Sequence, residues 1–393
     1  MSLLPVADAQ ARLFALARRL PIEMVPVGRS VGRWLARDIL ALRDQPWADL
    51  SAMDGYAVRA AEYPGPWRLA GESAAGAAHL PALSRGEAVR IFTGAPLPPG
   101  ADAILMQENA TRDGDLLRAN ADPLPAGRHV RPAASDFARD TVLLRAGTRI
   151  GPAQIALAVL AGHGDLPVHA RPRVALLSTG NELVPPGAPT PPGFLPSSNA
   201  PMLAAMLADV PCDVIDLGII ADDLDAMVAA LEQAREADII VSTGGASVGD
   251  HDLVRPAFAK AGGTLDFWKI RMRPGKPLMA GRLGGSLFLG LPGNPVSAFV
   301  TGTLFLLPLI RHLGGAADPL PPVGESRLAS PLPATGDRDD YLRAWRSRDG
   351  AVSVTSQDSA ATAAMAQADC LILRPAGSPP ALPGDRVTVL PLA

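Results

Sequence analysis

Acidic side chains and paired glycines gather in one stretch of the chain, residues 238–252, which reads DIIVSTGGASVGDHD. Its first five residues are mostly β-branched and apolar, which indicates a strand buried on both faces of a parallel sheet. Gly244 and Gly245 then permit a sharp turn and a close approach to a ligand. Asp250 and Asp252 follow this turn. Because ligands collect at the carboxyl ends of strands in open α/β sheets, the stretch predicts a binding site. The alternative is a glycine-rich turn with a capping Asp.

A second predicted strand ends in the same signature. The segment RVALLSTGNEL closes with Ser178, Thr179 and Gly180 and continues to Glu182, and Asp222 follows a further predicted strand. Parallel strands bring their carboxyl ends to one sheet edge, so we expect these carboxylates to lie together. Hard oxygen ligands of this kind suit Mg²⁺ bridged to a phosphate. Alternatively, Asp222 could cap the helix that begins in DDLDAM.

Two proline-containing loops could hold an oxyanion. The loop RPGKP contains Arg273 and Lys276, and the turn LPGNP contains Pro292 and Pro295. Lysine is rare in this chain, because only three of the 36 Lys and Arg residues are lysines, and Lys269 and Lys276 flank the longer loop KIRMRPGKP. A stiff backbone that carries a compact cation is suited to anion binding. The alternative is that both segments are ordinary tight turns.

Composition argues against several classes of function. The chain has 393 residues, a net charge of -3 and a pI near 6.1, whereas nucleic-acid-binding domains are usually strongly basic. No GxxxxGK[ST] loop and no GxGxxG between a strand and a helix is present. Cys212 and Cys370 lie far apart and the six histidines do not cluster, so a zinc site is not expected. We expect no nucleic-acid partner.

The N-terminal segment MSLLPVADAQARLFALARRL mixes Asp and Arg into its apolar run. This pattern is typical of neither a secretory signal nor a membrane span. We therefore expect a cytoplasmic protein with no membrane partner.

The order of predicted elements indicates a multidomain α/β plus β fold. Between residues 171 and 318, predicted strands alternate with helices expected over 199–208, 224–236 and 254–261, and a long apolar helix starts at Val296. This alternation is typical of a doubly wound, mostly parallel sheet. It would place the candidate residues above at the carboxyl edge of one sheet.

A chain of this length exceeds what one core usually supports. The remaining chain is expected to form a helical, extended N-terminal domain (1–43 and 137–170), an inserted β domain (44–136) and a small C-terminal β domain (319–393). Apolar spacing predicts helices over 9–20, 31–40 and 152–160 in the first of these. The Asp54-Gly55 turn and an alternating strand after it are typical of the inserted domain.

Taken together, these segments resemble the molybdopterin molybdenumtransferase family, which includes MoeA and the gephyrin E domain. The resemblance is carried by SAMDGYAV, IFTGAPLPPGADAILMQE, STGNEL, STGGASVGDHD, PGKP and LPGNPVSA, in the order and spacing of the family. It covers nearly the whole chain, from about Val25 onward. It implies the four domains above and a homodimer, with the active cleft between the α/β domain of one subunit and the inserted β domain of the other.

The resemblance also implies an activity, the transfer of molybdenum from molybdate to adenylylated molybdopterin with Mg²⁺ and release of AMP. The family acids around the nucleotide and the metal match Glu182, Asp222 and Asp252, with Asp250 adjacent. The family positions of the inserted domain, which approach from the partner chain, match Asp54, Thr93 and Asp136. These six matched acids and hydroxyls, without Asp250, are the candidate catalytic residues.

The positions expected to hold molybdate match Lys276, Ser297, Arg343 and Ser359. Arg273 stands where the family often has Lys, and the segment before Asn199 lacks an acidic residue that is often found there. The other candidate cofactor-binding residues are Ser178, Thr179, Gly180, Gly244, Gly245, Ser247, Asp250, Lys269, Pro292 and Pro295.

Two other hypotheses remain. A scaffold like the gephyrin E domain belongs to a two-part protein with an attached adenylyltransferase domain, which we do not expect here. A stand-alone molybdopterin adenylyltransferase resembles the α/β domain alone, and the SAMDGYA segment and the C-terminal domain argue against it. Besides a second copy of the chain, expected partners are other molybdenum-cofactor biosynthesis proteins and the apo-molybdoenzymes that receive the product.

Overall fold

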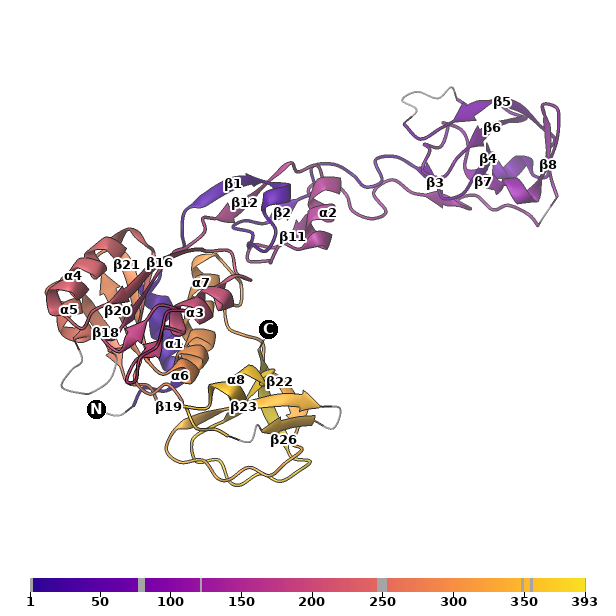
Figure 1. The fold of residues 1–393 in the computed structure, drawn as a ribbon. Helices are drawn as coiled ribbons and strands as arrows, with labels where there is room; N and C mark the ends of the chain where they lie inside the picture. Colours follow the sequence, from indigo (N-terminus) through magenta and orange to yellow (C-terminus); the bar gives the residue numbers. More distant parts are fainter. Residues whose placement is uncertain are drawn as a thin grey trace.

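The structure, a computed structural model, describes residues 3–76, 82–120, 122–245, 253–347, 350–353 and 356–392. Three candidate site residues, Ser247, Asp250 and Asp252, lie outside these ranges. The molecule is elongated: the α/β and C-terminal domains lie at one end, and an arm leads to the inserted β domain at the other end (Figure 1).

The α/β domain is built on a six-stranded sheet. Its strands are, in spatial order, β16 (Asp213–Ile220), β13 (Arg173–Thr179), β17 (Ile239–Thr243), β21 (Ser286–Leu291), β20 (Met279–Leu283) and β18 (Thr264–Trp268). The first four run parallel, β20 runs antiparallel to both of its neighbours, and β18 therefore has the same direction as the first four. The buried apolar runs of β13, β17 and β21 explain this arrangement, since parallel strands are covered on both faces.

Helices cover both faces of this sheet. One face packs against α1 (Val6–Leu16), α3 (Asn199–Leu207), α6 (Pro295–Thr301) and α7 (Leu307–Leu313), and the other against α4 (Leu224–Gln233) and α5 (Val254–Lys260). The prediction of a doubly wound, mostly parallel sheet is therefore confirmed. Residues 295–313 are long and apolar enough to cross a membrane, but 78% of this apolar stretch is buried, as expected for a core helix.

Helix α1 belongs by its packing to the α/β domain. Leu13 is fully buried in the same core as the sheet, and Gln10 Nε2 donates a hydrogen bond to the Leu304 carbonyl oxygen at 2.8 Å. This position differs from the expectation that residues 1–43 form one domain with 137–170. Sequence spacing predicts an amphipathic helix but does not say which domain receives its apolar face.

The arm consists of short antiparallel ribbons and one helix. Strand β1 (Ile22–Pro26) pairs with β12 (Asp165–His169), β2 (Ile39–Leu40) pairs with β11 (Val142–Leu144), and α2 covers Pro152–Leu160. The predicted helix over 31–40 is wrong. Gly32 adopts a φ of +80°, and Trp34 and Leu35 form bridges to Arg149 and Val168 instead.

The inserted domain contains a six-stranded sheet. Its spatial order is β7 (Ala103–Met106), β4 (Gly55–Val58), β6 (Glu87–Ile91), β5 (Trp67–Ser73), β9 (Leu116–Ala119) and β8 (Ala110–Asp113). The strands β3 (Leu50–Ser51) and β10 (Val130–Arg131) pair where the arm enters it. Trp67 and Leu117 are fully buried in its core.

The C-terminal domain shares its sheet with the α/β domain. Its own elements are β22 (Gly324–Arg327), β23 (Asp339–Ser347), β24 (Gly350–Ser353), α8 (Thr362–Ala366), β25 (Cys370–Arg374) and β26 (Arg386–Pro391). Strand β19 (Met272–Arg273) leaves the α/β domain and pairs in parallel with β23. The RPGKP loop, which begins at Arg273, is thereby fixed against the C-terminal domain.

Candidate functional site

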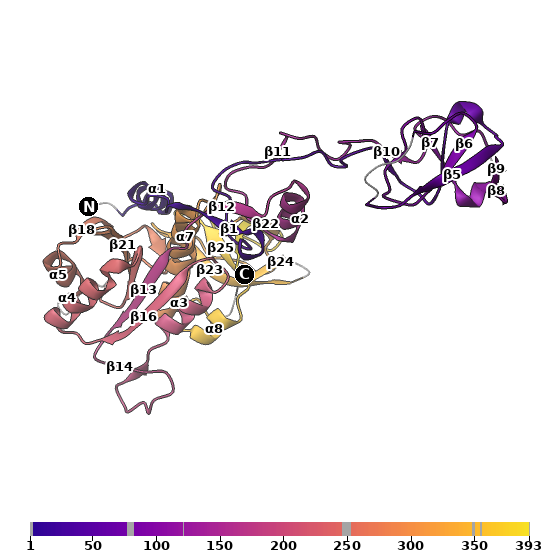
Figure 2. The same ribbon diagram turned by 90° about the horizontal axis from the view of Figure 1, so that it is seen from above.

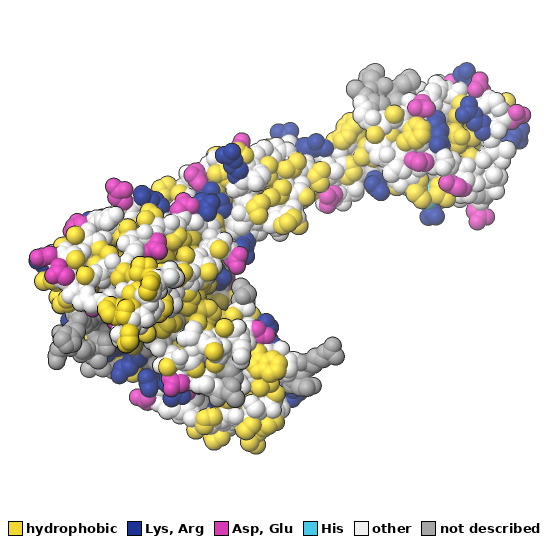
Figure 3. All heavy atoms as spheres, in the orientation of Figure 1, with side chains coloured by type: hydrophobic (Ala, Val, Ile, Leu, Met, Phe, Trp, Pro, Cys, Tyr) yellow, Lys and Arg dark blue, Asp and Glu magenta, His cyan; other side chains and the backbone are white. Residues whose placement is uncertain are grey.

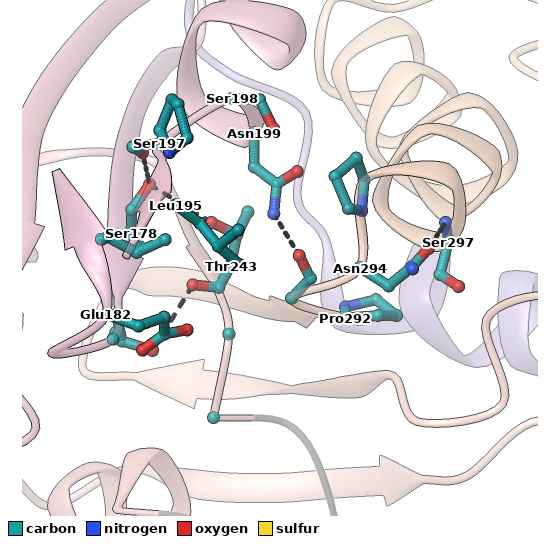
Figure 4. A pocket seen from close by; sticks show the side chains of 18 of the residues that line it. Ser178, Glu182, Leu195, Ser197, Ser198, Asn199, Thr243, Pro292, Asn294 and Ser297 are labelled. Carbon is teal, nitrogen blue, oxygen red and sulfur yellow. Dashed lines mark hydrogen bonds between the residues drawn. The ribbon is translucent and has the colours of Figure 1, made fainter. Parts of the chain in front are cut away.

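A cavity of about 590 Å³ lies at the carboxyl ends of the parallel strands. Its walls include eight of the candidate cofactor-binding residues, which are Ser178, Thr179, Gly180, Gly244, Gly245, Pro292, Pro295 and Ser297. Figure 4 labels Ser178, Pro292 and Ser297 among them. Leu183 of β14 (Leu183–Val184) and Leu195 of β15 (Leu195–Pro196) also line it, from a loop that projects from the domain (Figure 2). The sheet edge expected to form a site therefore forms one wall of a cavity.

The two Ser-Thr-Gly turns touch each other at the base of this cavity. Thr179 Oγ1 donates to the Thr243 carbonyl oxygen at 3.4 Å, and Thr243 Oγ1 lies 3.3 Å from Ser178 Oγ. Gly244 has a φ of +95°, and a Cβ atom there would lie 2.7 Å from Thr179 Oγ1. Glycine is therefore required at this position both for its backbone conformation and for the close approach of the two turns.

Two carboxylates lie on the wall of the same cavity. Glu182 and Asp222 both line it, and Asp222 is fixed by a pair of hydrogen bonds with Asn181. Asn181 N donates to Asp222 Oδ2 at 3.1 Å, and Asp222 N donates to Asn181 Oδ1 at 3.0 Å. The alternative role of Asp222 as a helix cap is wrong, because Asp223 Oδ1 accepts the hydrogen bonds that cap α4.

A smaller cavity of about 260 Å³ adjoins the first and is cationic. Its lining includes the candidates Arg273, Lys276, Ser297, Arg343 and Ser359, together with Arg338 and Pro277. The two cavities share Pro277 and Ser297 as lining residues. A cavity bordered by carboxylates in the α/β domain thus lies beside a cavity, lined by both the α/β and the C-terminal domain, that is bordered by guanidinium and ammonium groups.

The guanidinium of Arg343 is buried and holds the loop that carries Ser359. It donates to three carbonyl oxygens, those of Ser356 at 3.1 Å, Asp358 at 2.9 Å and Ala361 at 3.0 Å. Burial lowers the pKa of Arg343 below its ordinary value. With the described residues these hydrogen bonds use three of the five N–H donors of the guanidinium, and the other two are available to a ligand.

The other cations of the RPGKP region differ in their surroundings. Arg273 Nη2 lies 2.7 Å from Asp340 Oδ2, whose side chain is buried on β23. Lys276 lines the smaller cavity. Lys269 lines neither cavity, since its Nζ atom lies 4.4 Å from the Trp268 ring centroid in a cation–π contact. The structure therefore does not bring Lys269 together with the other candidates.

Whether the larger cavity could hold a metal ion depends on the carboxylates that line it. Among residues that the structure describes, no group of three or more His, Cys, Asp or Glu side chains could hold a metal ion. Glu182 and Asp222 line one cavity, and the third candidate, Asp252, is outside the described ranges. Mg²⁺ usually takes one or two protein carboxylates together with phosphate oxygens and water, so two carboxylates fit it.

Three candidate residues lie in the inserted domain or where the arm meets it, at the far end of the same chain (Figure 1). Thr93 donates from its backbone N and from Oγ1 to Asp54 Oδ1, at 2.7 and 2.9 Å. These two hydrogen bonds lower the pKa of Asp54 below its ordinary value. Asp136 is exposed, and its backbone N donates to the Gln45 carbonyl oxygen at 2.9 Å. Within one chain, these residues line neither of the two cavities.

Two polar residues that line the cavities, Asn199 and Arg338, were not among the candidates selected from the sequence. Asn199 lines the larger cavity from the first residue of α3, and Arg338 lines the smaller one. The position of Asn199 as the first residue of a predicted helix was an available signal, because that helix follows a segment at the strand edge. No comparable signal marks Arg338, whose neighbours Asp337 and Asp339 suggest an exposed polar turn.

Three family profiles match this chain. Residues 4–162 match the MoeA N-terminal region (domain I and II), and residues 175–312 match a probable molybdopterin binding domain. Residues 325–392 match the MoeA C-terminal region (domain IV). The matched segments include both the inserted domain and the C-terminal domain, which a protein resembling the α/β domain alone would lack.

Similar proteins are found over nearly the full chain. Molybdopterin molybdenumtransferase 2 of Mycobacterium tuberculosis (strain ATCC 25618 / H37Rv) is 38% identical over 335 residues, which cover 81% of this chain and 82% of the relative. Molybdopterin molybdenumtransferase of Bacillus subtilis (strain 168) is 32% identical over 402 residues, covering 98% and 94%. The crystal structure of the molybdopterin biosynthesis MoeA protein from Pyrococcus horikosii has a TM-score of 0.86 at 30% identity and covers 99% of each chain.

Proposed function

We propose a course of reaction for this chain, which belongs to the molybdopterin molybdenumtransferase (MoeA) family and is a transferase that inserts molybdenum into molybdopterin. The substrates are molybdate and adenylylated molybdopterin. The two dithiolene thiols form bonds to molybdenum and displace two of its oxygens, which leave as hydroxide or water with the thiol protons. One water adds across the phosphoanhydride bond, so that this bond breaks, the phosphate stays on molybdopterin and AMP leaves. The products are molybdenum cofactor and AMP.

The pair of adjoining cavities carries this proposal. Adenylylated molybdopterin is long, because a phosphoanhydride separates its pterin and adenine ends, and it fits the larger cavity of about 590 Å³. Molybdate is a small tetrahedral dianion that suits the cationic cavity of about 260 Å³. Their shared border at Ser297 and Pro277 would bring the dithiolene next to molybdate. Reaction then depends largely on holding the two substrates in contact.

Glu182 and Asp222 would hold Mg²⁺ against the phosphoanhydride, with Asp252 as a third ligand. When bound, Mg²⁺ would supply Lewis-acid polarisation of the phosphoryl oxygens. Asn181 keeps the Asp222 carboxylate in place through their two mutual hydrogen bonds. The Gly244 and Gly245 turn lets backbone approach the substrate between these acids.

Molybdate would be bound by charge-assisted donors of the smaller cavity. Lys276 and Arg273 supply charge, Ser297 and Ser359 supply hydroxyl groups, and Arg343 supplies its two remaining N–H groups. Arg273 is more than half exposed and paired with Asp340, so we assign it the weaker contribution.

A second copy of the chain would complete the site. Asp54, Thr93 and Asp136 lie at the far end of the arm within one chain, so they could approach the cavities only from another subunit (Figure 1). Figure 3 shows exposed apolar side chains along the arm, which a dimer could cover. Leu42 and Trp47, which lie on either side of the junction with the inserted domain, are 50% and 56% exposed. We place this homodimer in the cytoplasm, where apo-molybdoenzymes and other cofactor-biosynthesis proteins would be its partners.

The experiment is a purified transfer reaction. Protein, adenylylated molybdopterin and Mg²⁺ are incubated with and without molybdate, and AMP and molybdenum cofactor are measured. We expect both products to form together only with molybdate, and EDTA to prevent their formation. AMP release without molybdenum insertion would overturn the proposal. Consumption of ATP with metal-free molybdopterin would instead assign an adenylyltransferase, and binding without turnover would assign a scaffold.

A further inference from the structure

Asn199 forms a bridge between two walls of the larger cavity. It is the first residue of α3, and its Nδ2 atom donates a hydrogen bond to the Gly293 carbonyl oxygen at 2.8 Å. A carbonyl oxygen can only accept, so the amide nitrogen must face Gly293. The orientation of the whole side-chain amide is therefore fixed by its surroundings.

The other end of this amide has no partner among the described residues. Asn199 Oδ1 is buried there without a hydrogen-bond donor, and the residue is only 8% exposed. A buried acceptor without a donor is destabilising, because it has lost its hydrogen bond to water. Among unpartnered buried side-chain atoms in the described ranges, this is the one that belongs to a residue lining either cavity. Such an atom is best explained by a donor that arrives with a ligand.

The direction of Oδ1 indicates which part of the ligand it meets. Figure 4 shows Nδ2 facing the turn at Pro292 and the amide oxygen turned toward the side where Asn294 and Ser297 lie. Ser297 borders the molybdate cavity proposed above. The dithiolene of molybdopterin is carried by a ring fused to the pterin, so sulfurs near that border place the pterin in this part of the larger cavity. The pterin edge offers N–H donors from its 2-amino group and ring nitrogens.

We infer that Asn199 determines substrate specificity by accepting an N–H hydrogen bond from the pterin of molybdopterin. The inference rests on the proposed function. It places the pterin end of the substrate at the end of the larger cavity that borders the smaller one. Asparagine suits the role because a single side chain both fastens the α3 wall to the Gly293 turn and presents an acceptor. The competing donor is the amino group of adenine. If Asn199 accepted from that group instead, the substrate would lie in the cavity with its pterin and adenine ends exchanged.

The test compares three probes on four proteins. The probes are metal-free molybdopterin, AMP and molybdate, each measured by equilibrium binding to the full chain. The proteins are the wild type, Asn199→Ala, Asn199→Asp and the control Asn120→Ala, which changes an exposed asparagine of the inserted domain. Thermal unfolding of each variant shows whether the fold is retained.

Asn199→Ala should weaken molybdopterin binding about tenfold, the effect of losing one hydrogen bond of about 1.4 kcal/mol. AMP and molybdate binding should stay within about twofold of the wild type, and Asn120→Ala should bind all probes normally. Asn199→Asp keeps an acceptor oxygen and should restore part of the lost molybdopterin affinity, whereas it cannot restore the Gly293 hydrogen bond.

Three outcomes would overturn the inference. A selective loss of AMP binding would assign Asn199 to the adenine. Two results would show that Asn199 acts only by fastening the cavity wall. One is an equal loss of affinity for all three probes, and the other is an equal loss of molybdopterin affinity in Asn199→Ala and Asn199→Asp. Unchanged molybdopterin binding would remove the contact altogether. Wild-type protein that binds none of the probes would instead contradict the proposed function itself.

Discussion

Thr93 donates two hydrogen bonds to a single carboxylate oxygen of Asp54, one from its backbone N at 2.7 Å and one from Oγ1 at 2.9 Å. Both favour the charged carboxylate and lower the pKa of Asp54, the backbone bond having the larger effect. The pair adjoins β4 and β6 of the inserted domain, which lies at the other end of the arm from the α/β domain (Figure 1). It is therefore an ionised, fixed acid on the surface that would approach a second subunit.

Thr93→Val should raise the pKa of Asp54 toward its ordinary value, because the hydroxyl donor is lost and the backbone donor remains. An Asp with a lowered pKa keeps its charge until the pH falls through that pKa, so the variant should lose the charge at a higher pH. Carboxyl NMR titration measures the shift, and the acid limb of the activity profile should move in the same direction. Thr93→Ser, which retains both donors, is the control. An unchanged titration in Thr93→Val would contradict the role of the hydroxyl.

Gly244→Ala should destabilise the protein and disrupt the larger cavity. The new Cβ atom would lie 2.7 Å from Thr179 Oγ1 and closer to its carbonyl oxygen, at a φ of +95°. Gly187→Ala is a matched control, because Gly187 has a φ of +80° but nothing within 4 Å of an added Cβ. Chemical denaturation should show that Gly244→Ala costs about 2 kcal/mol more than the control. If both variants lost the same free energy of unfolding, the close approach of the two turns would not contribute to stability.

Arg343→Lys should weaken both the fold of the C-terminal domain and molybdate binding. An ammonium group cannot replace the planar guanidinium that donates to three carbonyl oxygens of one loop. We expect a loss of about 3 kcal/mol in the free energy of unfolding. The control Arg346→Lys changes a half-exposed arginine of the same strand, 4.0 Å from Asp369, and should cost less than about 1 kcal/mol. Wild-type stability and molybdate affinity in Arg343→Lys would refute this role.

Mixed dimers should reveal whether the cleft is shared. In a dimer of one Asp54→Ala subunit and one Asp222→Ala subunit, a shared cleft leaves one site with both carboxylates and one with neither. We expect the purified mixed dimer to show about half of the wild-type transfer activity, while both mutant homodimers are inactive. A mixed dimer as inactive as the homodimers would show that each chain uses its own Asp54.

Helices whose apolar residues recur at a regular spacing could be predicted from the sequence. The apolar spacing of 152–160 and 199–207 gives helices because both segments bury a face against neighbouring elements. Residues 31–40 contain similar apolar residues but form bridges to Arg149 and Val168, and no local pattern encodes those distant partners. The packing of α1 on the α/β domain was missed for the same reason.

In the candidate site, too, some residues could be predicted from local sequence patterns, whereas others depend on partners that are distant in sequence. Glu182 and Asp222 could be placed together because both follow parallel strands of one sheet. The fixed amide of Asn199 depends on the Gly293 carbonyl, 94 residues away in sequence, so no spacing rule predicts it. Lys269 was chosen because it flanks the RPGKP loop, yet its φ of +76° and its contact with Trp268 place it outside both cavities.

Anomalous diffraction at the molybdenum edge, from crystals soaked in molybdate together with AMP and Mg²⁺, tests the adjoining cavities most directly. A molybdenum peak in the smaller cavity, within hydrogen-bonding distance of Lys276 and Ser297, with AMP in the larger cavity beside Glu182 and Asp222, is the result we predict. A molybdenum peak away from the residues that line the smaller cavity, or AMP bound outside the larger one, would contradict the account.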